Sequence, residues 1–391
     1  MTESKKVVIA GYVRSPFTPA TKGELAGVRP DDLVAQTVTG LIKKTGVDPH
    51  KIDDLKLGCA MPEGEQGLNM ARLVVLQAGL PEEIGGVTIN RFCGSSMQAI
   101  HDAAGAISMG MQDAVICAGV ESMSRVPMGG FNPMPNPSLY KASPGAYMGM
   151  GETAENVAAQ KEVSREEQEA FSLKSQFKAA AAKKAGKMDA EIVAIKTPKG
   201  KLVKDDGCIR EDSTAEGLKK LKPAFKSDGT VTAATSSPVT DGAAAVLVCS
   251  EEFALKNGLE ILAEVKSFAV TGLDPTIMGM GPVPATKKAM AKAGITMDNV
   301  AIVEMNEAFA SQSIACQKEL GIADDKLNKH GGAIALGHPL GATGARITGK
   351  AAQLLHDEGK DGDYAISTQC IGAGQGITTV LKKYTPAAPK P

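Results

Sequence analysis

The sequence has almost no net charge and no long hydrophobic run, and each of these absences excludes a class of protein. Lysine and arginine number 43 and aspartate and glutamate 44, which leaves a net charge of -1. This balance gives no general electrostatic attraction to nucleic acid or to an anionic membrane. No run of 18 or more apolar residues occurs, so we expect no membrane insertion. Any anionic ligand must therefore be held by local groups.

The cysteines lack the spacing of a disulfide framework or of a zinc site, and they form no C-x-x-C pair. The N-terminus passes from a short charged lead into an apolar run too brief for a signal peptide. We therefore expect a cytoplasmic protein without a metal site, and we expect residues 382–391, "KKYTPAAPKP", to form a frayed tail. The cysteines are at positions 59, 93, 117, 208, 249, 316 and 370.

Strand-like and helical patterns alternate along the 391 residues. Apolar runs at 6–13 and 113–120 are typical of buried strands, and the stretches 31–46 and 68–80 have helical periodicity. This alternation predicts an α/β architecture. The length allows two or three domains.

A weak internal repeat divides the chain. Residues 41–57 and 289–305 share one pattern: a helix that ends in Lys-x-Gly, an aliphatic residue, a polar turn and a second apolar segment. This repeat predicts two related halves. Between them, residues 122–152 are rich in proline, glycine, methionine and asparagine and predict a long loop. Ser164 and Glu167 then form a capping box that predicts the start of a helix.

Cys93 lies in "VTINRFCGSSMQAI", where a short alternating strand meets a helix rich in small residues. Unpaired N–H groups and the dipole at a helix start stabilise a thiolate, so this position predicts a lowered pKa and a nucleophilic role. A small buried hydrophobic side chain is the alternative, and most free cysteines are of that kind.

Three more candidate residues each have an ordinary structural explanation. In "VEMNEAFASQSIA" a strand is expected to end at Asn306 and a helix to begin with Glu307, so helix capping alone accounts for the motif. His338, between a glycine and a proline, fits a structural or a functional role. Cys370 ends a predicted strand before a glycine run whose N–H groups could face an oxyanion, or it is a buried thiol.

Taken together, four motifs in order resemble the thiolase family over nearly the whole chain: "NRFCGSSMQAI", "NEAFA", "GGAIALGHPLGATGAR" and "CIGAGQG". The resemblance implies a five-layered α-β-α-β-α core of two similar mixed-sheet halves with an inserted loop domain. It implies an N-terminal half at 1–120, completed by about 243–268. A loop domain that binds CoA would follow at 121–242, and a C-terminal half at 269–391.

The same resemblance implies roles for the motif residues. Cys93 would be the acyl-accepting nucleophile, His338 would activate it, and Cys370 would act as general acid and base. Asn306 would hold a water that forms one oxyanion hole with His338. The backbone N–H groups of Cys93 and Gly372 would form the other. Such a site carries out ping-pong acyl transfer through an acyl-cysteine.

Coenzyme A would be a substrate, and no prosthetic group is implied. Arg210 would lie at the nucleotide end of the CoA and Ser237 near its pantetheine. The loop domain and the C-terminal half would supply the remaining contacts of the acyl and pantetheine tunnel. The implied substrate-binding residues are Arg210, Ser237, Met150, Phe225, Ala233 and Phe309.

Two departures from the biosynthetic branch of the family indicate its degradative branch. Here "GMG" at 149–151 stands in place of His-Met-Gly, and "ATSSP" at 234–238 in place of Gly-Asn-Ala-Ser-Gly. We therefore expect a 3-ketoacyl-CoA thiolase of fatty-acid β-oxidation that cleaves 3-oxoacyl-CoA with CoA, giving acetyl-CoA and a shortened acyl-CoA. The alternatives are an acetyl-CoA acetyltransferase and a noncatalytic acyl-CoA-binding or lipid-binding relative. The family also implies a homodimer or homotetramer, with a hydratase/dehydrogenase as a candidate partner.

Overall fold

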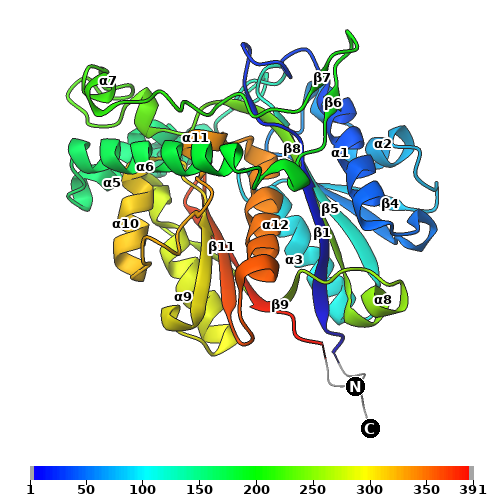
Figure 1. The fold of residues 1–391 in the computed structure, drawn as a ribbon. Coiled ribbons are helices and arrows are strands. Elements are labelled where there is room, and N and C mark those ends of the chain that lie inside the picture. Colours follow the sequence, from blue (N-terminus) through cyan, green and yellow to red (C-terminus); the bar gives the residue numbers. More distant parts are fainter. Residues whose placement is uncertain (1–3, 387–391) are drawn as a thin grey trace.

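Ten strands form one continuous sheet within residues 4–386, the part of the chain that the computed structural model describes (Figure 1). The strand order is β10-β11-β12-β9-β1-β8-β5-β3-β4, and β2 pairs with β8 outside this path. The first half contributes β1 (Val7–Arg14), β2 (Thr18–Pro19), β3 (Asp54–Gly58), β4 (Gly85–Ile89), β5 (Ala114–Ser122) and β8 (Thr240–Ser250). The second half contributes β9 (Ala263–Gly272), β10 (Val300–Met305), β11 (Tyr364–Ile371) and β12 (Gln375–Lys383).

The two halves of the sheet have the same order and the same strand directions. In the first half β8 is antiparallel to β1 and β5, and β3 is parallel to β5 and β4. In the second half β12 is antiparallel to β9 and β11, and β10 is parallel to β11. A parallel bridge from Leu327 to Val303 takes the place of β4. Within the sheet of residues 4–386, two residue pairs between β1 and β9 join the halves.

Six helices, packed in three pairs, and the two halves of the sheet form five layers (Figure 1). One pair packs on the first half, one pair on the second, and the third pair lies between the halves and contacts strands of both. The sequence prediction of an α-β-α-β-α core is thus confirmed. The outer pairs are α1 (Pro30–Thr45) with α2 (Met70–Gln77), and α9 (Pro282–Ala293) with α10 (Ala310–Leu320); the central pair is α3 (Ser95–Ser108) with α12 (Leu340–Glu358).

Small residues allow the central helices to pack closely. A Cβ added at Gly344 of α12 would lie 2.3 Å from the backbone nitrogen of Met97 in α3. A Cβ at Gly119 of β5 would lie 2.2 Å from the carbonyl oxygen of Gly341. Since atoms at such distances clash, glycine is required at both positions.

The sequence repeat corresponds to equivalent structure in the two halves. Gly46 and Gly294 follow α1 and α9 with φ of 67° and 68°, as helix-ending glycines often do. A short 3-10 turn follows each, Pro49–Lys51 in one half and Met297–Asn299 in the other, and leads into β3 or β10. The repeated pattern therefore encodes one helix-turn-strand unit used twice.

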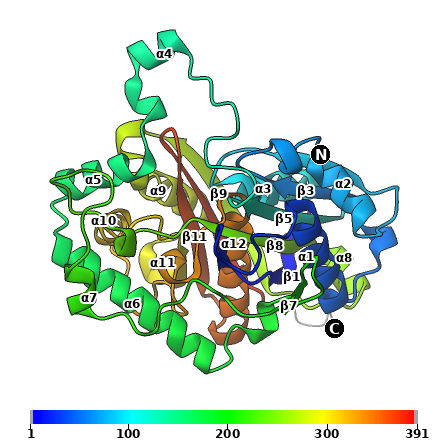
Figure 2. The ribbon, with the colours of Figure 1, turned by 90° about the horizontal axis from the view of Figure 1, so that it is seen from above.

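Between β5 and β8 the chain leaves the layered core and forms the inserted segment. The predicted capping box is present, because Ser164 Oγ accepts the Glu167 N–H at 3.1 Å. The stretch expected to be a loop contains the short helix α4, a 3-10 turn at Pro144–Tyr147 and the start of α5. Helix α4 stands away from the body in Figure 2. The elements here are α4 (Pro137–Ala142), α5 (Met150–Gln160), α6 (Arg165–Lys184), α7 (Ala215–Lys219), β6 (Ile195–Lys196) and β7 (Leu202–Val203).

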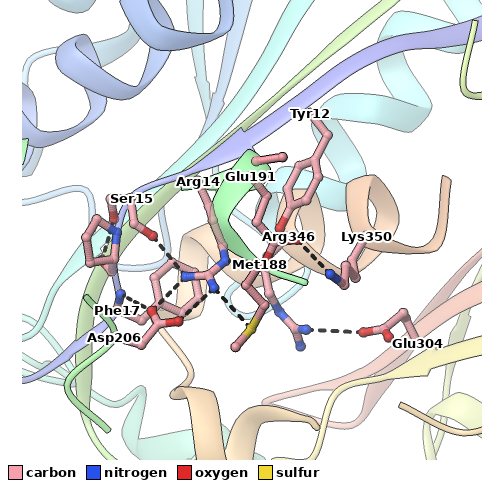
Figure 3. A network of polar contacts seen from close by, with 12 residues as sticks. Tyr12, Arg14, Ser15, Phe17, Met188, Glu191, Asp206, Glu304, Arg346 and Lys350 are labelled. Carbon is pink, nitrogen blue, oxygen red and sulfur yellow. Dashed lines mark hydrogen bonds and ion pairs between the residues drawn. The ribbon is translucent and has the colours of Figure 1, made fainter. Parts of the chain in front are cut away.

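A buried network of charges ties the inserted segment to the core (Figure 3). Arg14 of β1 donates to both carboxylate oxygens of Asp206 at 2.7 Å and to Glu191 at 2.8 Å. Lys350 of α12 donates to the other oxygen of Glu191 at 2.8 Å. These contacts hold residues 191–206 against β1 and α12. Removing one partner would destabilise the protein, because it would leave an uncompensated buried charge.

The end of the chain differs in part from the sequence prediction. The expected tail begins later, because Lys382 and Lys383 are the last residues of β12 and pair with β9. Residues 384–386 have no regular structure, and the remainder of the predicted tail, 387–391, lies outside the described residues. Among residues 4–386, no helix is long and apolar enough to cross a membrane.

Candidate active site

Cys93 lies between β4 and α3, where the chain turns sharply. Phe92 has a φ of 44°, and its N–H donates to the Asn90 side chain at 2.9 Å. The Cys93 sulfur accepts hydrogen bonds from its own N–H and from that of Gly372. Burial nevertheless raises the pKa of Cys93 to about 11. The expectation of a lowered pKa is therefore wrong for the free protein, because loss of hydration outweighs the N–H groups.

Side chains that the motif analysis did not select hold this turn against the second half. The Gln369 side-chain amide donates to the Cys93 carbonyl. Arg91 Nη1 donates to Gln375 Oε1 at 2.7 Å. Both contacts join the Cys93 turn to the β11–β12 hairpin that carries Gly372. Their positions beside the cysteine motifs, in "NRFCG" and "TQCIG", were the only sequence signal.

His338 precedes α12 and is 5% exposed. Its Nδ1 is 2.6 Å from Thr343 Oγ1, and its Nε2 accepts a hydrogen bond from Asn306 Nδ2 at 3.3 Å. Burial, aided by the Arg346 guanidinium, lowers the pKa of His338 to about 3. The imidazole is therefore neutral at physiological pH and can accept a proton.

Asn306 does not cap a helix, contrary to the structural alternative considered for its motif. The helix expected at Glu307 begins at Ala310, and Asn306 points to His338 instead. Glu307 is buried and accepts a hydrogen bond from Ser175 at 2.6 Å. Within this motif, the Asn306 amide thus lies beside His338, and the Glu307 carboxylate holds α6 of the inserted segment.

Cys370 lies near the end of β11 and is 1% exposed. Burial raises its pKa well above the usual value, and the neighbouring Cys93 sulfur adds to the shift. Cys370 belongs to an apolar cluster with Met150 and Phe309. A Cβ added at Gly372 would lie 3.5 Å from the Met150 sulfur. Met150 and Phe309, which the resemblance implies for the acyl tunnel, thus lie beside the part of the hairpin that carries Cys370 and Gly372.

Phe225 extends this apolar wall from the inserted segment. Its ring meets that of Phe309 edge to face, with centroids 5.9 Å apart, and it remains 44% exposed. A Cβ at Gly151 would lie 2.1 Å from the Phe225 ring. The second glycine of the "GMG" stretch thus leaves room for this aromatic side chain.

A cavity of about 170 Å³ opens between α6 and residues 207–238 of the inserted segment. Arg210 and Ala233, both implied for CoA, line it. Ser236 lines it in place of Ser237, which is half-buried and donates its N–H to the Ala308 carbonyl at 3.0 Å. The cavity could hold part of a CoA molecule. In residues 4–386, no cluster of three or more histidine, cysteine, aspartate or glutamate side chains could hold a metal.

Comparison with protein-family models gives two matches. Residues 7–252 match the thiolase N-terminal domain and residues 259–383 the thiolase C-terminal domain. The chain belongs to the thiolase family of acyltransferases.

Individual relatives agree with this assignment. The chain is 45% identical to the 3-ketoacyl-CoA thiolase of Saccharophagus degradans and 44% identical to that of Bacillus subtilis; each alignment covers 97% of this chain and 99% of the relative. Human mitochondrial 3-ketoacyl-CoA thiolase superposes with a TM-score of 0.89 at 36% identity, covering 97% of this chain and 99% of that one. The Bacillus anthracis acetyl-CoA acetyltransferase superposes with a TM-score of 0.90 at 37% identity, covering 98% and 100%.

Proposed function

We propose that this protein is a 3-ketoacyl-CoA thiolase that cleaves 3-oxoacyl-CoA with CoA in the β-oxidation of fatty acids. Two observations carry the proposal. His338 is neutral and hydrogen-bonded to Asn306, and the Gly372 N–H and the Cys370 thiol lie beside the Cys93 sulfur. Curated relatives at 44–46% identity bear this name.

The first half-reaction uses the neutral thiol and the neutral imidazole. As the Cys93 sulfur attacks the 3-keto carbon, its proton passes to His338. Burial raises the pKa of the Cys93 thiol and lowers the pKa of the His338 imidazole, which disfavours a thiolate-imidazolium pair before substrate binds. Proton transfer therefore accompanies C–S bond formation. The N–H groups of Cys93 and Gly372, with Asn306 and protonated His338, then stabilise oxyanions.

Collapse of the tetrahedral intermediate breaks the bond between the second and third carbons. The enolate of acetyl-CoA leaves and takes a proton from Cys370. The shortened acyl group stays on Cys93 as a thioester. CoA then attacks this thioester while Cys370 takes the CoA thiol proton. The shortened acyl-CoA is released as the Cys93 sulfur leaves and takes its proton back from His338, which restores both cysteines and the neutral imidazole.

We place the CoA nucleotide beside Arg210 and its pantetheine along the cavity toward Phe309. A structure of human mitochondrial 3-ketoacyl-CoA thiolase in complex with CoA, with a TM-score of 0.88 to this chain, supports a CoA site in this fold. Replacing Arg210 with alanine tests the placement. The KM for CoA should rise about tenfold at unchanged kcat, as expected for loss of a charge-assisted hydrogen bond.

The decisive experiment measures thiolysis of 3-oxoacyl-CoA substrates of four to sixteen carbons, with Cys93→Ala as the blank. A kcat/KM that rises beyond four carbons supports the proposal. Activity confined to acetoacetyl-CoA would favour the second candidate, an acetyl-CoA acetyltransferase. The structural similarity to the Bacillus anthracis acetyl-CoA acetyltransferase supports this candidate. Binding of acyl-CoA without turnover would indicate a noncatalytic relative.

We also propose a homo-oligomer, a homodimer or homotetramer, that works in the cytoplasm. The strand β4 lies at one end of the sheet, and Leu73, Leu76 and Val87 expose 41%, 47% and 41% of their surface beside it. An unpaired edge with apolar neighbours favours association with another chain. All seven cysteines are free thiols, which fits a reducing compartment. Light scattering coupled to size exclusion measures the oligomeric state.

A further inference from the structure

The buried hydroxyl of Thr343 contacts Nδ1 of His338, whereas Asn306 contacts Nε2. Thr343 lies in the first turn of α12, and its side chain is fully buried. Its Oγ1 is 2.6 Å from His338 Nδ1 and 3.0 Å from the carbonyl oxygen of Pro339. A neutral imidazole carries its proton on one nitrogen, so this contact decides which nitrogen remains free to accept another.

Only one arrangement of protons places a donor against an acceptor at every contact of the ring and of Thr343 Oγ1. The Asn306 Nδ2 group is a donor, so Nε2 beside it accepts and the ring proton lies on Nδ1. Nδ1–H then donates to Thr343 Oγ1. The single hydroxyl hydrogen goes to the Pro339 carbonyl, a bond that helical threonines commonly make to the residue four positions earlier. The opposite tautomer would set Nε2–H against the N–H groups of Asn306.

We propose that Thr343 is a positioning residue that holds His338 in the Nδ1–H tautomer, which leaves Nε2 as the base for the Cys93 proton. After proton transfer the ring is a cation, and the Thr343 oxygen still accepts from Nδ1–H. Thr343 acts only through His338. The inference deepens the proposed function and rests on its use of Cys93 and His338.

Three variants separate this role from a packing role. Thr343→Val keeps the shape of the side chain and removes the hydroxyl, whereas Thr343→Ser keeps the hydroxyl and removes the methyl. Thr348→Val is the matched control. Thr348 is equally buried on the same helix, and its Oγ1 lies 2.9 Å from Ser367 Oγ, so this variant also loses a buried hydrogen bond.

The first measurement is the burst of p-nitrophenol released as p-nitrophenyl acetate acylates Cys93, with Cys93→Ala as the blank. Thr343→Val should slow the burst about 10- to 100-fold, less than the roughly 10⁴-fold lost when a charged tautomer-fixing group is replaced. Thr343→Ser and Thr348→Val should stay within about threefold of the parent. In thiolysis, Thr343→Val should lower kcat and leave KM within about twofold. A burst of parental rate in Thr343→Val, or an equally slow one in Thr343→Ser, would overturn the proposal.

The second measurement needs no variant of Thr343 to fold. In protein labelled with ¹⁵N-histidine, the His338 signals are assigned by their loss in His338→Asn, and their shifts distinguish protonated from unprotonated ring nitrogens. We expect the proton on Nδ1; a proton on Nε2 would refute the inference. Neither the aryl ester nor the spectrum involves acyl-CoA, so a failed thiolysis assay with these results intact would count against the proposed function alone.

Discussion

The two halves of the sheet have the same strand order and direction, yet they differ at one equivalent point. In the second half the chain leaves β11 at Ile371 and enters β12 at Gln375, so residues 372–374 make a tight turn. In the first half the chain leaves β5 at Ser122 and returns in β8 only at Thr240. The tight turn brings the Gly372 N–H to the Cys93 sulfur, and the long insertion supplies most of the residues that line the cavity. One scaffold thus performs two tasks through different connections.

The candidate catalytic residues also occupy equivalent points. Cys93 precedes the central helix α3 in the first half, and His338 precedes α12 in the second. Each follows a segment at the outer edge of its half, β4 in one case and the bridge at Leu327 in the other. Because α3 and α12 pack side by side, the segments that carry Cys93 and His338 come from different halves and lead into neighbouring helices. The comparison makes four predictions.

Removing one cysteine from each half should give the largest effects, and different ones. Cys93→Ala should abolish acyl-enzyme formation, because no nucleophile remains. Cys370→Ala should acylate slowly and fail to turn over, since the CoA thiol then lacks its base. Intact mass after mixing with acetyl-CoA detects the acyl adduct, and thiolysis gives turnover. Full thiolysis by Cys370→Ala would remove that residue from the mechanism.

The resting protonation state of the pair can be tested with iodoacetamide, which reacts with the thiolate. Burial raises the pKa of Cys93 to about 11 and lowers that of His338 to about 3, so both groups are neutral near pH 7. The rate of Cys93 alkylation should therefore rise about tenfold per unit between pH 7 and 9 without a plateau. A pH-independent rate in that range would mean that a thiolate-imidazolium pair already exists.

Packing between the halves can be tested with two glycines on the central helices. A methyl group at Gly344 would meet the α3 backbone, so Gly344→Ala should destabilise the protein by about 3 kcal/mol or more. Gly105→Ala in α3 is the control, because nothing lies within 4 Å of its added Cβ. The control should be neutral or stabilising by about 0.5–1 kcal/mol. Urea unfolding of both variants at one protein concentration measures the difference.

A buried histidine on the same interface should give the smallest effect. His101 of α3 lies 2.8 Å from Thr379 of β12 and stacks on Phe268. Burial, with Arg91 and Lys292, lowers its pKa to about 3. Below about pH 6.5 the unfolded chain binds a proton that the folded chain does not, so stability falls as pH decreases from 6.5 toward 3. Between pH 7.5 and 5.5 this residue should account for about 1.4 kcal/mol.

The control for this effect is His101→Gln, which cannot take up a proton. Its unfolding free energy should fall less than that of the parent over the same pH interval. An identical fall in both proteins would show that His101 is already accessible to protons in the folded state.

Local patterns predicted the elements well. Continuous apolar runs predicted β1 and β5, and the Ser164 capping box predicted the start of α6, because these signals depend on neighbours in the chain. The motif match also selected Cys93, His338, Cys370 and Asn306 for one site. The order of four motifs carries that information, although each motif alone fits an ordinary structural role.

Features that depend on distant partners were missed. The raised pKa of Cys93 comes from burial by other segments, which the helix-start argument did not include. The contact of the Gln369 side chain with the Cys93 carbonyl was missed for the same reason. Thr343 lies in the same motif as His338, but the motif does not show that its hydroxyl turns toward the ring. Asn306 resembled a helix cap because asparagine before glutamate favours one, but the helix begins at Ala310.

The equivalent positions of Cys93 and His338 bear on how such a protein could arise. If a single half had once been encoded by its own gene, two identical copies would have placed the same residue at both positions. A thiol and an imidazole could not then have differed between the sites. Fusion of two copies into one chain allows each position to change independently. In evolutionary terms, this division of labour between an attacking sulfur and its base depends on the linkage of the two repeats.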